Sequence, residues 1–146
     1  MHDDTRSLRK AVAVVLLLGM LGLGAELLFI EHIEGWQQVA PVAALALGIG
    51  TLAWDAAAKS GGSRLALRLA MLGLLVSGVA GVYLHYDSNA AFQRELDPSL
   101  GTWPLILKTL RAHSPPSLAP AAMGLLGALG WIVTAGRTPS LETPPR

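Results

Sequence analysis

The chain has 146 residues, of which 52% are hydrophobic and 14% charged, and its mean hydropathy is +0.49. These values are typical of membrane proteins and exclude most soluble enzymes. The net charge of +1 creates no long-range field, so we expect no nucleic-acid partner. Because cysteine is absent, the sequence excludes disulfides, thiol catalysis and thiolate metal sites.

Four apolar segments, separated by charged or proline-rich breaks, organise the chain: residues 11–30, 39–54, 69–86 and 118–134. Each is close to the roughly 20 residues that cross a hydrocarbon core, although the second and fourth are short. The sequence therefore predicts an all-α fold, an integral membrane four-helix bundle over residues 11–135. Residues 1–10 would form a cytoplasmic N-terminal segment, and the proline-containing residues 136–146 a disordered cytoplasmic tail.

The first apolar segment also has features of a cleaved signal peptide. Basic residues precede it, and Gly22-Leu23-Gly24 offers a cleavage site between small residues. The apolar run, however, continues past Glu26 to Ile30, which is too long for the core of a typical signal peptide. We therefore expect this segment to remain as a true span.

The basic residues predict the orientation of the spans. If the first span runs from inside to outside, the inner side holds Arg6, Arg9, Lys10, Lys59, Arg64, Arg68, Arg137 and Arg146. The outer side holds only Arg94, Lys108 and Arg111. Because lysine and arginine concentrate on the cytoplasmic side, both termini are expected in the cytoplasm. Trp36 and Trp54 would bracket the second span as interface anchors, about 27 Å apart in a helix.

Residues 87–117 are expected to form one long outer loop that contains a short amphipathic helix. Thr102 and Pro104 suit a helix start. The apolar positions recur at helical spacing, with Lys108 and Arg111 on the opposite side; they are Trp103, Ile106, Leu107 and Leu110. The pattern predicts a helix that lies on the membrane surface.

Small residues recur on the faces by which membrane helices approach one another closely. In the third span the small residues follow a four-residue spacing, and in the first they precede Glu26. In the fourth they give the helix a narrow face. The residues expected at helix contacts are Gly19, Gly22, Gly73, Ser77, Gly81 and Gly124.

Glu26 is the strongest single signal, because a carboxylate among apolar neighbours inside a span is costly. Glu26 lies 16 residues after Lys10, and His85 lies 17 residues after Arg68. At about 1.5 Å per residue both would sit at one depth in the outer half of the membrane. Three interpretations stay open: a buried Glu26–His85 hydrogen bond, a role in handling protons or a metal, and a carboxylate that reaches out to the interface.

The segment Glu31-His32-x-Glu34 has the composition of a metal site, although His32 and Glu34 would lie on nearly opposite faces of a helix. One interpretation is a solvated acidic helix end. The other is a composite site for a divalent metal, because imidazole and carboxylate ligands suit zinc, copper, nickel or iron. The candidate ligands are Glu26, His32, Glu34, His85 and Asn89. A haem held by two histidines is less favoured, since no Cys-x-x-Cys-His motif is present.

Several of these residues also carry a resemblance. The patterns are Glu26-Leu-Leu-x-x-Glu31-His32-x-Glu34-x-Trp36-Gln37-x-x-x-Pro41, then His85-x-x-x-Asn89-x-x-Phe92 and Glu95, then Pro115-Pro116-x-Leu118-Ala119-Pro120. In these the chain resembles uncharacterised small four-span integral membrane proteins of bacteria. The resemblance implies the fold and a multi-pass location in the inner (plasma) membrane, and it implies no chemistry.

Two classes of function follow. The favoured one is a non-enzymatic accessory or interaction subunit of a larger membrane complex, whose partners would be the lipid bilayer and either another membrane protein or further copies of the chain. The alternative is a binding or transport protein for a divalent metal or protons that uses the outer Glu/His cluster. An enzyme is disfavoured, because no P-loop, nucleophile elbow or paired-carboxylate motif is visible. No cofactor is expected, apart from the divalent metal of the alternative.

Overall fold

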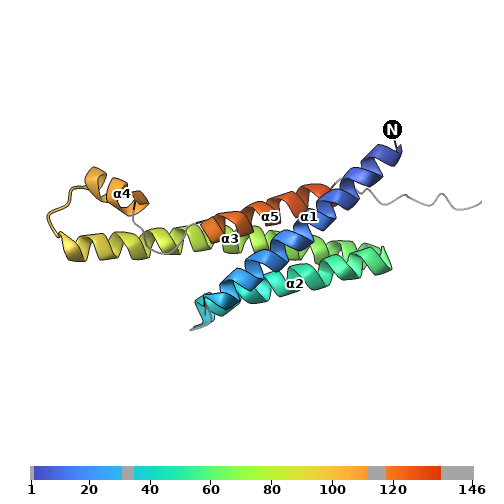
Figure 1. Ribbon diagram of the computed structural model, residues 1–146, viewed down its shortest axis with the longest axis horizontal. Coiled ribbons are helices and arrows are strands. Elements are labelled where there is room, and N and C mark those ends of the chain that lie inside the picture. Colours follow the sequence, from blue (N-terminus) through green and yellow to red (C-terminus); the bar gives the residue numbers. More distant parts are fainter. Residues whose placement is uncertain (1, 31–34, 112–117, 136–146) are drawn as a thin grey trace, which may run out of the picture.

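The structure, a computed structural model, describes residues 2–30, 35–111 and 118–135, and in these ranges it consists of five helices and short connections (Figure 1). The helices are α1 (His2–Phe29), α2 (Trp36–Ala58), α3 (Gly61–Leu96), α4 (Thr102–Arg111) and α5 (Leu118–Ala135). The described residues contain no strand. The all-α prediction is confirmed.

Three helices are long and apolar enough to cross a membrane: the part of α1 from Thr5 to Phe29, α2 and α3. The apolar part of α5, Leu118–Thr134, is shorter. Large apolar side chains point away from the helix contacts; Leu18, Val79 and Leu125 are 63–69% exposed. Outward apolar faces of this extent are expected where lipid surrounds a protein. The chain thus has the candidate transmembrane helices of a membrane protein.

The four long helices meet in the cyclic order α1–α2–α3–α5, because α1 contacts α2 and α5, and α3 contacts the same two helices. The buried side chains of α1 recur every three or four residues, so that they form one face. Together with residues of α2, α3 and α5 they form the apolar core: Leu16, Met20, Leu23, Leu27, Leu45, Leu67, Met71, Leu74 and Met123.

α3 and α5 pack backbone to backbone along most of α5. A Cβ on Gly78 of α3 would lie 2.6 Å from the carbonyl oxygen of Pro120 and 2.6 Å from the Cα of Gly124. A Cβ on Gly127 of α5 would likewise collide with the backbone of Leu75. Only glycine allows this approach, which is a recurrent device in membrane helix pairs.

α3 continues well beyond its apolar segment. The prediction of a loop over residues 87–117 is wrong for residues 87–96, which extend α3 to 36 residues, about 54 Å of helix. The cause is that hydropathy reports where lipid contact ends, whereas alanine, glutamine, arginine and glutamate in this stretch still favour a helix. Residues 85–96 of α3 together with α4 are called the arm below. In Figure 1 the arm projects beyond the other helices, and α4 lies beside the end of α3.

The connection between α2 and α3 is a tight turn of defined geometry. Lys59 ends α2 in the left-handed conformation, with φ 49°, and Ser60 caps α3. The Ser60 hydroxyl accepts a hydrogen bond from the Ser63 N–H at 3.0 Å, and the Ser63 hydroxyl accepts one from the Ser60 N–H at 3.0 Å. This reciprocal capping box fixes where α3 begins.

Candidate functional site

A pocket of about 330 Å³ lies where α1, α2, α3 and α5 come together near the Phe29 end of α1. Its apolar lining comes from all four helices and includes Leu27, Leu84 and Met123. The polar lining side chains are Gln37, Gln38, Ser77, His85 and Ser88. This volume is at the lower end of those of small-molecule sites, and a mostly apolar wall with a few polar groups is typical of them.

Local sequence explains why polar groups reach this pocket. Ser77, His85 and Ser88 lie on one side of α3, at spacings of eight and three residues that keep them on a common face. In α2, Pro41 lies inside the helix and has no N–H. The carbonyl of Gln37, four residues earlier, therefore has no helical donor from that position.

Glu26 lies outside the pocket. It is exposed, because the neighbouring positions Leu23 and Leu27 are the ones that α1 turns toward the core. His85, in contrast, is half-buried in the pocket wall. The two residues thus differ in burial, and the Glu26–His85 hydrogen bond stays a prediction. An exposed carboxylate within an apolar helix needs either a partner outside this chain or access to the interface.

The candidate metal ligands do not converge within the part of the chain that the structure describes. No group of three or more histidine, aspartate or glutamate residues there could hold a metal ion. Asn89 lies one turn beyond His85 on α3 and is half-buried. His32 and Glu34, with Glu31, lie outside the described residues, so the composite metal site stays a prediction.

The small residues selected from the sequence divide into two groups. Gly19 approaches Leu126, Gly81 approaches Pro120, and Gly124 approaches Gly78, so these three lie at helix contacts. Ser77 lines the pocket. Gly22 and Gly73 are exposed, and a Cβ at either would meet no described atom within 4 Å. Among the described residues, Gly22 of α1 and Gly73 of α3 thus lie at no close helix contact. In α3 it is the face with Gly78 that packs on α5.

The arm holds the predicted amphipathic helix. α4 packs on α3 through Leu105 and Thr109, both of which are buried, while Ile106 is half-buried at the edge of this contact. Trp103, Leu107 and Leu110 remain outside it, Trp103 at 69% and Leu110 at 70% exposure. The helix thus has one face on α3 and a second, uncovered apolar face.

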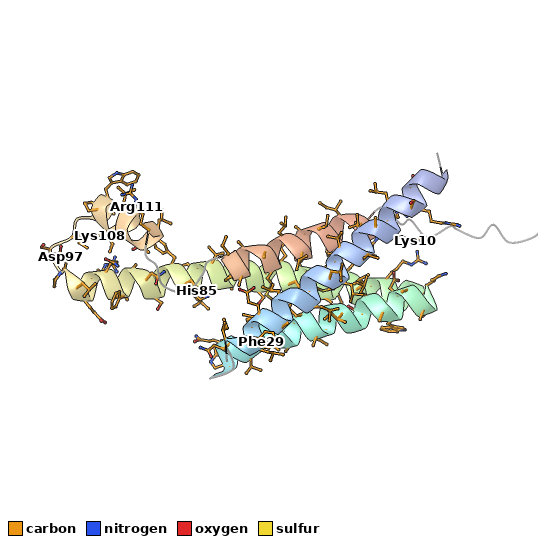
Figure 2. All side chains as sticks on the ribbon, viewed as in Figure 1. Lys10, Phe29, His85, Asp97, Lys108 and Arg111 are labelled. Carbon is orange, nitrogen blue, oxygen red and sulfur yellow. The ribbon has the colours of Figure 1, made fainter. Side chains whose placement is uncertain are left out.

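A small polar cluster closes the turn between α3 and α4. The Ser99 hydroxyl donates a hydrogen bond to Asp97 Oδ1 at 2.6 Å, the Ser99 N–H donates to the same oxygen at 3.1 Å, and Lys108 Nζ lies 3.8 Å from Asp97 Oδ2. The two bonds from Ser99, aided by the charge of Lys108, hold the pKa of the Asp97 carboxyl below its ordinary value. Figure 2 shows Asp97 and Lys108 at the tip of the arm, far from Lys10.

Two polar contacts between helices were missed by the sequence reasoning. Ser63 donates a hydrogen bond to Asp55 Oδ1 at 3.1 Å, and Arg68 Nη2 donates to the carbonyl oxygen of Thr134 at 2.6 Å. The Ser60-x-x-Ser63 spacing could have indicated the capping box that positions Ser63 next to Asp55. The cation at the C-terminal end of α5 could be found only from the tertiary arrangement.

A comparison with known protein families, with curated proteins and with solved structures found no match. The resemblance to small four-span bacterial membrane proteins therefore stays a prediction, and the function is argued from the geometry.

Proposed function

We propose that the chain is a non-enzymatic, four-span membrane protein of the bacterial inner (plasma) membrane, which serves as an accessory or interaction subunit of a larger membrane complex. Three long apolar helices support the spans. α5 adds 18 residues, about 27 Å of helix, and contacts both α1 and α3. In this arrangement both termini lie in the cytoplasm, as the distribution of basic residues favours.

The observation that carries the proposal is that helix α4 packs on α3 and still exposes a second, apolar face. The buried residues Leu105 and Thr109 hold α4 against α3. α3 itself is about 24 Å longer than a helix that only crosses a hydrocarbon core of about 30 Å. The apolar face of Trp103, Leu107 and Leu110 is therefore presented at or above the membrane surface instead of being buried against its own chain. Large aromatic and aliphatic side chains held on a rigid element are typical anchors of a protein interface.

The exposed carboxylate of Glu26 supports the same proposal. Glu26 lies within a candidate span and is exposed on the surface of α1. Association with another membrane protein, or with a second copy of the chain, would give this group a polar partner, which is the usual state of an ionisable residue in a span.

The test is purification in a mild detergent, with the co-purifying proteins identified by mass spectrometry. We expect a defined membrane-protein partner that is lost from the variant Trp103→Ser with Leu110→Ser and retained by Arg111→Gln, an exposed change on the same helix. Retention of the partner by the first variant would show that α4 does not hold it. Absence of any partner from the unaltered protein, cross-linked in intact cells, would contradict the accessory role.

The pocket that contains His85 favours a second candidate, the binding or transport of protons or a divalent metal. His85, Gln37 and Gln38 offer ligand atoms there. If this candidate were correct, the purified protein would carry a divalent ion that is lost in His85→Ala and released below about pH 6, because imidazole must be deprotonated to bind. We expect elemental analysis to find no such ion.

A further inference from the structure

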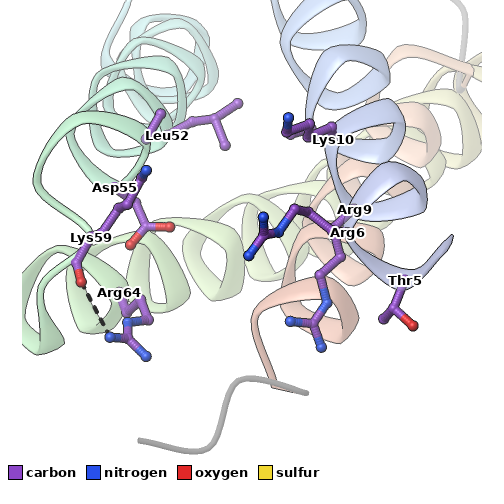
Figure 3. A pocket seen from close by; sticks show the side chains of 10 residues that line it. Thr5, Arg6, Arg9, Lys10, Leu52, Asp55, Lys59 and Arg64 are labelled. Carbon is purple, nitrogen blue, oxygen red and sulfur yellow. Dashed lines mark hydrogen bonds between the residues drawn. The ribbon is translucent and has the colours of Figure 1, made fainter. Parts of the chain in front are cut away.

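A second and larger pocket lies at the opposite end of the helices, between the N-terminal part of α1 and the turn that joins α2 to α3. Its volume is about 1240 Å³. Figure 3 shows its labelled side chains on two opposing walls, with Arg6, Arg9 and Lys10 from α1 facing Asp55, Lys59 and Arg64. The sequence analysis used these basic residues only to orient the spans.

The lining of this pocket is strongly cationic. Among the lining side chains that the structure describes, five are basic, namely Arg6, Arg9, Lys10, Lys59 and Arg64, and one is acidic, Asp55. They come from α1, α2, α3 and the turn that joins α2 to α3. Cations gathered around one cavity repel each other, and an anion bound between them would offset this repulsion.

Asp55, the one carboxylate among the described lining residues, does not neutralise the pocket. Asp55 is buried, at 4% exposure, and accepts a hydrogen bond from the Ser63 hydroxyl at 3.1 Å, so it also serves the α2–α3 turn. Arg9 extends from α1 toward Asp55 across the pocket (Figure 3). Even with one cation set against Asp55, four basic groups remain around the cavity.

Polarity is graded along the axis of the pocket. The apolar lining residues Ala13 and Leu52 lie toward the middle of α1 and α2, whereas Ala56 and the basic residues lie toward the ends of α1, α2 and α3. In a membrane this places the apolar part in the hydrocarbon region and the cations at the level of the lipid phosphates. Basic pockets between helices at this level are a known mode of binding anionic head groups.

From this geometry we infer that the pocket binds a phosphate-bearing anion, with an anionic phospholipid head group as the source that its position favours. The phosphate oxygens would accept hydrogen bonds from the arginine and lysine side chains, because guanidinium groups match phosphate geometry and ammonium groups add charge. The acyl chains of a lipid would leave along Ala13 and Leu52. This inference is independent of the proposed partner site on α4, which lies at the other end of the molecule.

The experiment uses the full chain in nanodiscs or detergent. Native mass spectrometry would count bound cardiolipin, phosphatidylglycerol or phosphatidylcholine. The test variant is Arg6→Gln with Lys10→Gln and Lys59→Gln, which spares Arg64 because it donates to the carbonyl oxygens of Ser60 and Lys59. Because each basic group near a membrane surface strengthens anion binding about fivefold, we expect the test variant to bind cardiolipin about 100-fold more weakly.

A matched control removes the same number of charges at the other end of the molecule: Arg94→Gln with Lys108→Gln and Arg111→Gln. We expect this control to bind as the unaltered protein does, and a variant with Arg6→Lys to retain binding. Equal losses in the test and control variants, or equal binding of phosphatidylcholine and cardiolipin, would overturn the inference.

A competition experiment separates the two sources of phosphate. If the ligand is a lipid, inorganic phosphate or a nucleotide at about 10 mM, in large excess over the protein, should not displace bound cardiolipin. Displacement by the soluble anion, lost in the test variant, would support the phosphate site and assign it to a water-soluble ligand. Failure of both lipid and soluble phosphate to bind would contradict the site and leave the role of α4 untouched.

Discussion

Single glycines decide how closely α3 and α5 approach. We expect Gly78→Ala to lower the free energy of unfolding by about 1–3 kcal/mol, because the new methyl group would meet backbone atoms of Gly124 and Pro120 that cannot yield as a flexible side chain can. Unfolding in mixed micelles, followed by circular dichroism, measures this loss.

Gly73→Ala is the matched control on the same helix. A Cβ there meets no described atom within 4 Å, and alanine favours a helix, so we expect unchanged or slightly higher stability, by up to about 1 kcal/mol. Because alanine favours a helix at both positions, equal losses would show that the loss at Gly78 does not come from its close contact with α5. A large loss at Gly73 alone would indicate that its exposed face packs on another molecule.

The same glycines show what the sequence could and could not predict. The sequence correctly indicates that small residues let the helices approach closely. It does not select the face, because in α3 the row of Gly73, Ser77 and Gly81 lies beside the position of Gly78. Which row meets α5 depends on the rotation of one helix against the other, and helical spacing alone does not contain that information.

Asp97 gives a prediction about pH. Its folded pKa lies below the ordinary 3.8, so the stabilisation of the α3–α4 turn is present above that value and is lost as the pH falls through the folded pKa. We expect the Asp97 carboxyl, followed by NMR, to titrate below 3.8, and Ser99→Ala to raise this pKa, since the Ser99 hydroxyl is the main cause of the shift. Titration of Asp97 at or above 3.8 in the unaltered protein would show that the Ser99 contacts are not made.

At the scale of elements, the turn between α2 and α3 depends on Ser63, which is fully buried. Ser63→Ala removes the donor to the buried carboxylate of Asp55 and half of the capping box. We expect a loss of about 1–3 kcal/mol in the free energy of unfolding, because a buried acceptor would lose its hydrogen bond.

Ser60→Gly is the control for this turn. Glycine is tolerated at the cap of a helix, so a loss of only a few tenths of a kcal/mol is expected there. If Ser60→Gly were as damaging as Ser63→Ala, the cap itself and not the link between Ser63 and Asp55 would stabilise the turn. Both measurements use the same micelle titration.

The arm shows where prediction of elements from this sequence stops. The apolar spacing of Trp103, Ile106, Leu107 and Leu110 predicts a helix here, and the structure has it as α4, Thr102–Arg111. The continuation of α3 to Leu96 was not predicted, because Asp87 ends the apolar run although the helix does not end there. The buried contacts of Leu105 and Thr109 depend on that continuation, so the face by which α4 docks could not be predicted either.

At the scale of the whole molecule, the structure separates two chemically different ends. The cationic pocket lies where the N-terminal part of α1 meets the α2–α3 turn, and the arm with Asp97, Lys108 and Arg111 lies at the opposite end, as Lys10 and Arg111 show in Figure 2. Of the glutamate and histidine residues expected near the arm, residues 31–34 lie outside the described residues. The pocket at this end therefore has His85 as its described imidazole. The basic end, which the sequence treated as a topology signal, is the better defined of the two.

This separation of the ends allows a direct test of orientation. The chain has no cysteine, so a single cysteine can be placed at Gly62, in the first turn of α3, or at Gly101, just before α4, both exposed positions. An added Cβ at either makes only ordinary contacts, at 3.9 Å from Ser60 Oγ and 3.8 Å from Pro104 Cδ, so both variants should fold. Because basic residues stay on the cytoplasmic side, a membrane-impermeant maleimide should label Gly101→Cys in intact cells and Gly62→Cys only after permeabilisation. The reverse pattern would show that the molecule has the opposite orientation. The cationic pocket would then lie at the outer surface, and the cytoplasmic leaflet could not supply its anionic lipid.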